Sequence, residues 1–249
     1  MSLFHLSRLT RRDTGALRTT ASVFGVYAGL LGMEHGYFEV LQGNVVPAGT
    51  RIRASASELP FPFGHEPALT IVPNFLVTGI LAMMFGLLIL IWAAVSVEKK
   101  NGGLVLFLLS TMLLLFGGGF GPITLLITAS IATAGINKPL PWWRSHLSAN
   151  FVESVARLWP WSFLAALLWV PAEFMVGHIF GVKNDPHPSL TNLNLVLSYP
   201  MLGLFVLTLI TGFACEIHKQ MDLQATPSLS GPSAPLEAKK GTVPLIEQS

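Results

Sequence analysis

Length, composition and charge exclude most classes of soluble protein. The chain has 249 residues, of which 51% are hydrophobic and only 11% are charged, and its mean hydropathy is +0.59. A soluble domain would carry roughly a quarter charged residues. The net charge of +2 is too small to indicate nucleic-acid binding, and the single cysteine, Cys215, excludes a disulfide framework or a cysteine-rich metal site. Long apolar runs alternate with short basic clusters, which is typical of an all-α, polytopic membrane protein.

The first apolar stretch, residues 19–41, follows a basic segment over residues 1–18. It is longer than the core of a signal peptide and lacks a small-residue cleavage site after it, so we expect the first transmembrane helix there. Three later stretches also meet the requirement of roughly 20 apolar residues. They cover residues 69–97, 159–182 and 194–215, and the first of them is preceded by an external loop over residues 42–68.

The apolar region 103–136 is too long for one ordinary span and short for two. Its middle, Gly117–Pro122, disfavours continuous helix, so we expect a short helical hairpin that turns at this run. The run has no preceding strand and no lysine, so it is not a phosphate-binding loop. With the hairpin the chain crosses six times, and twelve Lys and Arg residues lie inside against three outside. The positive-inside rule therefore predicts six spans with both termini in the cytoplasm.

Between the hairpin and the fifth span, tryptophans lie beside arginines. This pattern suits the headgroup zone and predicts an interfacial helix near residues 142–157. The tail from residue 223 is rich in Pro, Ser, Ala and Lys, which is typical of disorder. The expected organisation is a basic cytoplasmic N-terminus (1–18), a single membrane domain (19–222) and a disordered cytoplasmic tail (223–249).

Three carboxyl groups fall within the expected spans, those of Glu34, Glu39 and Glu173. A charge inside a bilayer costs about 2.5–3.5 kcal/mol on insertion scales, so such residues usually mark a functional site. No Lys or Arg lies in a span to neutralise them, and the imidazoles available are His35 and His178. We expect each carboxyl group to be protonated, paired with histidine, bound to a cation or in contact with water.

The expected depths place these polar groups mainly in the outer half of the membrane. This placement predicts an outward-facing pocket for a small or lipidic ligand. Its candidate residues are Glu34, His35, Glu39, Asn74, Glu173, His178 and Tyr199. The carboxyl and imidazole groups could also supply metal ligands, but their spacing is unspecific, so we predict no metal site and the sequence indicates no cofactor.

The first span carries a stripe of small residues that would allow another helix to approach closely. The stripe consists of Gly25, Gly29, Gly32 and Gly36. His35 and Glu39 are four residues apart and border this stripe, so they can contact each other and a neighbouring helix. Glu34 points nearly the opposite way around the helix.

Several segments together resemble a group of small, uncharacterised multi-pass membrane proteins of bacteria and archaea. These segments are Gly32–Gly36, Glu39–Asn44, Glu66–Gly79, Asn101–Gly103, Gly117–Pro122 and Trp142–Leu147. The resemblance runs from about Gly29 to Lys219. It implies a multi-pass protein of a prokaryotic plasma membrane, and it implies no activity, cofactor or functional residue.

Three functions remain open from the sequence. The first is binding of a small or lipidic ligand by a permease-like protein or a sensor. The second is an accessory subunit, in which the glycine stripe serves assembly into a homo-oligomer or a membrane complex. The third is an intramembrane enzyme that uses Glu and His as acid and base on a lipid or quinone.

Overall fold

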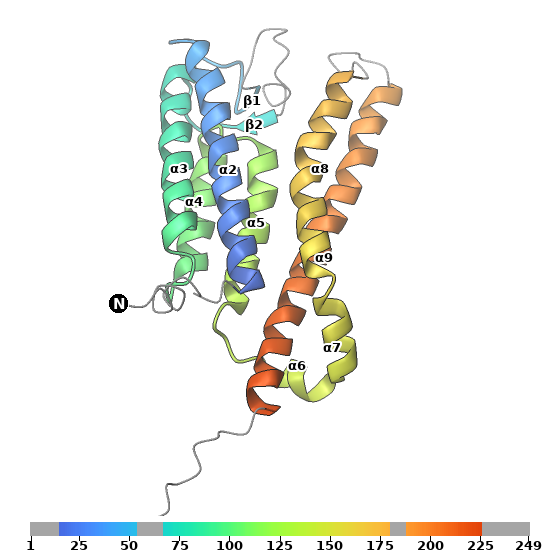
Figure 1. Cartoon of the computed structure of the whole chain (residues 1–249). Helices are drawn as coiled ribbons and strands as arrows, with labels where there is room; N and C mark the ends of the chain where they lie inside the picture. The colour runs from blue at the N-terminus through green and yellow to red at the C-terminus, as the bar shows by residue number, and fades with distance from the viewer. Residues whose placement is uncertain (1–14, 54–66, 180–187, 226–249) are drawn as a thin grey trace, which may run out of the picture.

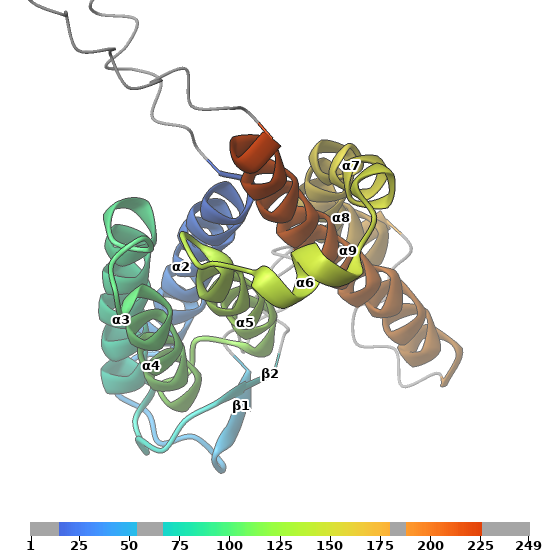
Figure 2. The same ribbon diagram turned by 90° about the horizontal axis from the view of Figure 1, so that it is seen from below.

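The long helices of the chain run alternately up and down beside one another (Figure 1). The computed structural model describes residues 15–53, 67–179 and 188–225, but not the side chains of residues 173–174, 176–179, 188–198 and 225. The long helices are α2 (Ala16–Leu41), α3 (Phe75–Val95), α4 (Gly102–Leu115), α5 (Phe120–Gly135), α8 (Trp159–Ile179) and α9 (Pro188–Ala225). Two short helices, α6 (Pro141–His146) and α7 (Ala149–Ala156), lie at the lower end, where α2 begins and α9 ends (Figure 2).

The fold is that of a mainly helical protein with membrane character. In the part of the chain that the structure describes, three segments are long and apolar enough to cross a membrane. They are Phe75–Val95, Ala149–Ala172 and Tyr199–Gln224. Helices α4 and α5 are apolar but shorter. The expected all-α class of membrane protein is thus supported.

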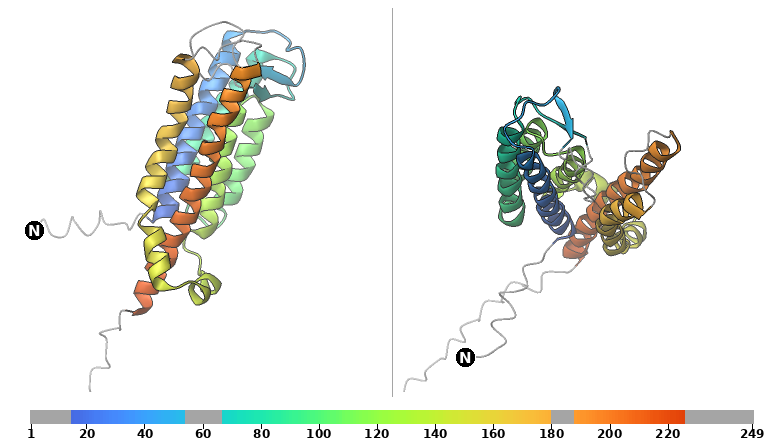
Figure 3. Two further views of the ribbon diagram at one scale, coloured as in Figure 1. Left: turned by 90° about the vertical axis from the view of Figure 1, so that its right-hand side faces the viewer. Right: turned by 90° about the horizontal axis from the view of Figure 1, so that it is seen from above.

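Helices α2 to α5 form one group, and the α8–α9 pair stands beside it (Figure 3). The two groups meet around Phe24 of α2, which is fully buried. Its ring stacks on Phe163 of α8 at 5.6 Å between centroids and contacts Phe205 of α9 at 5.4 Å. One turn earlier, the Trp159 indole N–H donates to the Thr20 hydroxyl at 3.2 Å. These contacts fix the α8–α9 pair against the lower half of α2.

The region 103–136 does form two helices joined by a tight turn, as the glycine run predicts. Helix α4 ends at Leu115 and α5 begins at Phe120. Pro122 therefore falls in the first turn of α5, where a missing backbone N–H costs no helical hydrogen bond.

Other expected boundaries were wrong. The stretch 69–97 is helical only from Phe75, because Asn74 caps the helix by accepting a hydrogen bond from the Val77 N–H at 3.1 Å. The expected external loop 42–68 contains strand β1 (Arg51–Arg53), which pairs antiparallel with β2 (Pro67–Leu69). The single helix expected near 142–157 is two helices, because Ser148 starts a new helix as its N-cap.

The first and last long helices extend beyond their predicted ends. Helix α2 begins at Ala16 rather than residue 19, and α9 covers Pro188–Ala225 rather than 194–215. The lower part of α9 is held by Gln220, which donates to the Lys138 carbonyl at 2.9 Å and accepts from the Leu140 N–H at 3.2 Å. Most of the expected N-terminal segment and tail lie outside the described residues.

Candidate functional site

The polar centre of the upper half is formed by His35 and Glu39 on α2. Both side chains are completely buried. They lie one helical turn apart, so they share one face of the helix. This face is directed at the turn between α4 and α5, although α2 and that turn are far apart in the sequence.

Two glycines of this turn, Gly117 and Gly119, form the opposite wall of the site. Gly117 and Gly119 have positive φ angles of 91° and 77°, a region that side-chain-bearing residues rarely adopt. A Cβ atom added to Gly117 would lie 2.6 Å from the Glu39 carboxyl carbon. A Cβ atom added to Gly119 would lie 2.5 Å from Nε2 of His35. The carboxyl group and the imidazole ring therefore pack directly on the backbone of the glycine turn.

Strand β2 and the residues after it hold this turn in place. The Gly117 N–H donates to the Leu69 carbonyl at 2.8 Å, and the Ile71 N–H donates to the Leu115 carbonyl at 3.0 Å. Between these two bonds, the buried hydroxyl of Thr70 lies 2.7 Å from that of Thr78 on α3. The turn is thus fixed from above by β2 and from the side by α3.

The Glu39 carboxyl group has an unusual environment. Neither of its oxygens has a hydrogen-bond partner among the described residues, and neither contacts solvent. Buried polar groups in proteins are nearly always hydrogen-bonded, and an ionised carboxylate without a partner is very costly in an apolar interior. The site thus offers two acceptor oxygens to a proton, a cation or a hydrogen-bond donor.

No protein-family model, curated protein or solved structure matches the chain.

The other candidate residues do not join His35 and Glu39 in one described pocket. Glu34 is half-buried and lies on a different face of α2. Asn74 is at the upper end of α3, where it caps the helix and bonds to Asn44 at 2.5 Å. Tyr199 is exposed on α9. The side chains of Glu173 and His178 lie outside the described residues.

The four glycines of α2 lie in contacts within the chain. Gly29 and Gly36 face α3, where a Cβ atom at Gly36 would lie 2.5 Å from the Gly79 carbonyl oxygen. Gly25 meets Ala93 of α3, and Gly32 meets Leu113 of α4. Because its own chain covers the stripe, it is not an exposed surface for an assembly partner.

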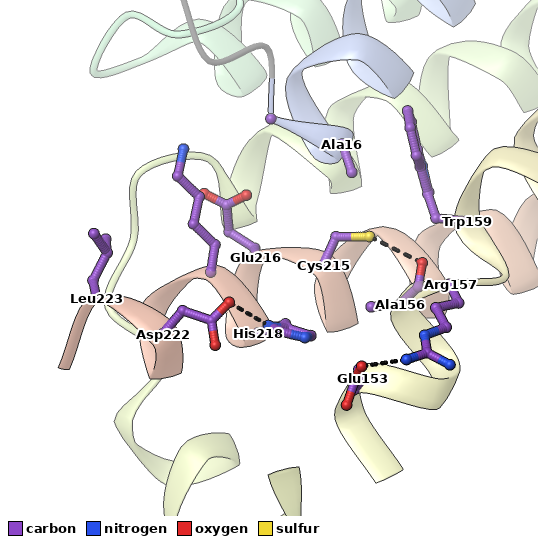
Figure 4. Close-up of a pocket in the computed structure, with 12 residues that line it drawn as sticks. Ala16, Glu153, Ala156, Arg157, Trp159, Cys215, Glu216, His218, Asp222 and Leu223 are labelled. Carbon is purple, nitrogen blue, oxygen red and sulfur yellow. Dashed lines mark hydrogen bonds and ion pairs between the residues drawn. The ribbon is translucent and has the colours of Figure 1, made fainter. Parts of the chain in front are cut away.

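A second polar region, not expected from the sequence, lies at the lower end (Figure 4). We call it the basal pocket. It is a hollow of about 700 Å³ between the start of α2, the end of α7, the start of α8 and the end of α9. Its polar lining residues are Glu153, Arg157, Trp159, Cys215, Glu216, His218, Lys219 and Asp222.

The residues that the sequence argument missed are Gly117 and Gly119 in the upper site and the polar residues of the basal pocket. The sequence predicts the glycine run only as a turn, although consecutive glycines are a signal for close packing against another segment. Within the described residues, no group of three His, Cys, Asp or Glu side chains is arranged to hold a metal ion.

Proposed function

We propose that the chain is a six-span membrane protein that binds a small ligand through Glu39 and His35, beneath the glycine turn. The single observation that carries this proposal is the fully buried Glu39 carboxyl group, whose oxygens lack a hydrogen-bond partner among the described residues. Intramembrane carboxyl groups are expensive and usually functional. A role in structure alone would have supplied this group with a donor.

In this proposal the protein lies in the plasma membrane of a prokaryotic cell. Both termini are in the cytoplasm, and the upper end of the molecule faces the outside of the cell. The alternating helix directions fit an even number of crossings. Most Lys and Arg residues in the described part of the chain lie at the lower end, whereas those at the upper end are all in β1. Those at the lower end are Arg18, Lys99, Lys100, Lys138, Arg144, Arg157 and Lys219, and those at the upper end are Arg51 and Arg53. This distribution follows the positive-inside rule.

The short hairpin α4–α5 gives the upper site a defined depth in this topology. Helix α4 has 14 residues and is therefore about 21 Å long, less than the roughly 30 Å of a hydrocarbon core. The glycine turn would then lie inside the outer edge of the membrane. Backbone groups at that depth need protein partners, and the bonds from Gly117 to Leu69 and from Ile71 to Leu115 supply them.

The chemistry of the site favours a cationic or hydrogen-bond-donating ligand. The Glu39 oxygens accept hydrogen bonds and stabilise positive charge, and the ring nitrogens of His35 one turn away can donate or accept a hydrogen bond. The glycine turn packs directly on both side chains, so the ligand, or its contacting group, is small. A permease-like protein or a sensor would use such a site. A lipidic ligand would insert its polar head there.

The experiment that tests this proposal is native mass spectrometry of the protein released from nanodiscs made from its own membranes. We expect a retained small molecule or lipid in the wild-type protein and its loss in Glu39→Gln. The matched control is Glu34→Gln, a half-buried carboxyl group on another face of the same helix, which should keep the ligand. Identical spectra for all three proteins would overturn the proposal.

The same experiment separates the alternatives. A bare chain in fixed stoichiometry with another protein would favour an accessory subunit. A lipid or quinone that is chemically altered by the wild-type protein and unaltered by Glu39→Gln would favour an intramembrane enzyme, in which Glu39 and His35 act as acid and base.

A further inference from the structure

The basal pocket has a lining in which acidic and basic groups are balanced. Glu153 of α7 pairs with Arg157, and an Asp222 carboxylate oxygen accepts from Nδ1 of His218 on α9 at 2.9 Å, as Figure 4 shows. Glu216 and Lys219, also on α9, complete the charged lining. The pocket therefore presents carboxylate oxygens and cationic N–H donors within one hollow.

Glu216 lies on the side of this pocket that faces the start of α2. A Cβ atom added to Gly15, the residue that precedes α2, would lie 3.2 Å from Oε2 of Glu216. The carboxyl group is therefore beside the first turn of α2, where helix amide groups favour negative charge. On the opposite side, the Arg157 side chain is 75% exposed. Glu153 contacts only one nitrogen of the guanidinium group, so the other N–H donors of Arg157 can bind a ligand.

The surroundings of the pocket are those of a membrane surface. Phe151 on α7, Leu158 and Trp161 are large apolar residues that are more than half exposed. Trp159 lines the pocket itself. Tryptophans and amphipathic helices at the end of apolar spans occupy the headgroup layer of a bilayer. A phospholipid headgroup is therefore the molecule that this pocket meets at high local concentration.

We propose that the basal pocket binds the headgroup of an aminophospholipid, which carries a phosphate and a primary ammonium group. Arg157 and Lys219 bind the phosphate, and Glu216 accepts hydrogen bonds from the ammonium. A purely anionic headgroup would be repelled by Glu216 and Asp222, and a purely cationic ligand by Arg157 and Lys219. A zwitterion matches both sets of charges. This proposal is independent of the Glu39 site.

The test uses the full chain, purified in detergent, with added phosphatidylethanolamine, phosphatidylcholine or phosphatidylglycerol. Binding is measured by native mass spectrometry and by the shift in the thermal unfolding midpoint. We expect phosphatidylethanolamine to bind most tightly, because the trimethylammonium of phosphatidylcholine donates no N–H bond and phosphatidylglycerol has no cation. Losing one charged hydrogen bond should weaken binding roughly tenfold.

The variants assign this preference to the pocket. Glu216→Gln should remove the preference for phosphatidylethanolamine over phosphatidylglycerol, and Lys219→Gln, an exposed substitution with little risk to folding, should weaken binding of all three lipids. Arg53→Gln, at the opposite end of the molecule, is the control and should change nothing. Equal binding of the three lipids by the wild-type protein would overturn the proposal, as would an unchanged preference in both pocket variants. Equally tight binding of soluble phosphoethanolamine would overturn the assignment to a membrane lipid.

Discussion

The carboxyl group of Glu39 lies against the Cα atom of Gly117, with no room between them for even a methyl group. Gly117 is the residue whose N–H is bound by the Leu69 carbonyl. Strand β2, the glycine turn and the buried carboxyl group of α2 are therefore stacked in direct contact. A ligand that bound Glu39 as proposed would have to displace this turn, which would connect its binding to β2 at the upper end.

Gly117→Ala should destabilise the protein strongly, for two separable reasons. Its φ angle of 91° is unfavourable for alanine, which costs about 1–3 kcal/mol, and the new Cβ atom would overlap the Glu39 carboxyl group. Gly43→Ala isolates the first effect, because Gly43 has a φ angle of 78° and no described atom within 4 Å of an added Cβ. Thermal unfolding in nanodiscs should show a clearly larger loss for Gly117→Ala.

The overlap can also be tested directly in a double variant. Glu39→Ala removes the carboxyl group that the new methyl group would meet, so it should recover part of the stability lost in Gly117→Ala. The backbone part of the cost should remain. Equal effects of Gly117→Ala and Gly43→Ala, or strict additivity of Gly117→Ala with Glu39→Ala, would contradict the packing described here.

Glu39→Leu should stabilise the protein while it abolishes ligand binding. The substitution replaces a buried polar group, which has no hydrogen-bond partner among the described residues, by an apolar one of similar size. Removing such an unsatisfied group should add about 1–3 kcal/mol to the free energy of unfolding. The contrasting variant is Thr78→Val, which breaks the buried hydrogen bond to Thr70 and should lower stability. A large loss of stability in Glu39→Leu would indicate a structural role for the carboxyl group.

Gly36→Ala should separate α2 from α3 and lower stability by several kcal/mol. Its Cβ atom would lie 2.5 Å from the Gly79 carbonyl oxygen and 2.8 Å from the Met83 nitrogen, which belong to a backbone that cannot yield locally. Gly203 on α9 provides the control, since no described atom lies within 4 Å of an added Cβ. Gly203→Ala should be neutral or stabilising by up to about 1 kcal/mol, because alanine favours helix more than glycine does. Similar effects at both positions, measured by thermal unfolding, would argue against a close α2–α3 contact.

Much of the helical layout could be predicted because hydropathy is a local property. The long apolar stretches, the break at Gly117–Gly119 and the common face of His35 and Glu39 all follow from residues near one another in the chain. The predicted helix boundaries were less accurate where a single capping side chain sets the start of the helix. Asn74 and Ser148 each start a helix as an N-cap, and apolar patterning does not register such a single hydrogen bond.

Which residues meet in each of the two sites is set by contacts between segments that are far apart in the sequence. Nothing local to Glu39 indicates that Gly117 covers it, and nothing local to Arg51–Arg53 indicates pairing with Pro67–Leu69. The basal pocket was missed for a related reason. Its charged residues lie at the ends of α7 and α9, where acidic and basic residues are common in any helix. They line one hollow only because these helix ends pack beside the start of α2.

The proposed orientation in the membrane predicts opposite labelling of the two ends. Cys215 is the only cysteine, so a Cys215→Ser background allows one cysteine to be placed at each end. Gly49→Cys, before β1, and Lys100→Cys, between α3 and α4, are both exposed positions in loops. In intact cells a membrane-impermeant maleimide should label position 49 and leave position 100 unlabelled until the membrane is permeabilised. The reverse pattern would invert the topology and place the basal pocket outside. Labelling of both positions in intact cells would place both outside, which requires an even number of crossings between them and would contradict α3 as a membrane span. The permeabilised sample serves as the reference for full reactivity.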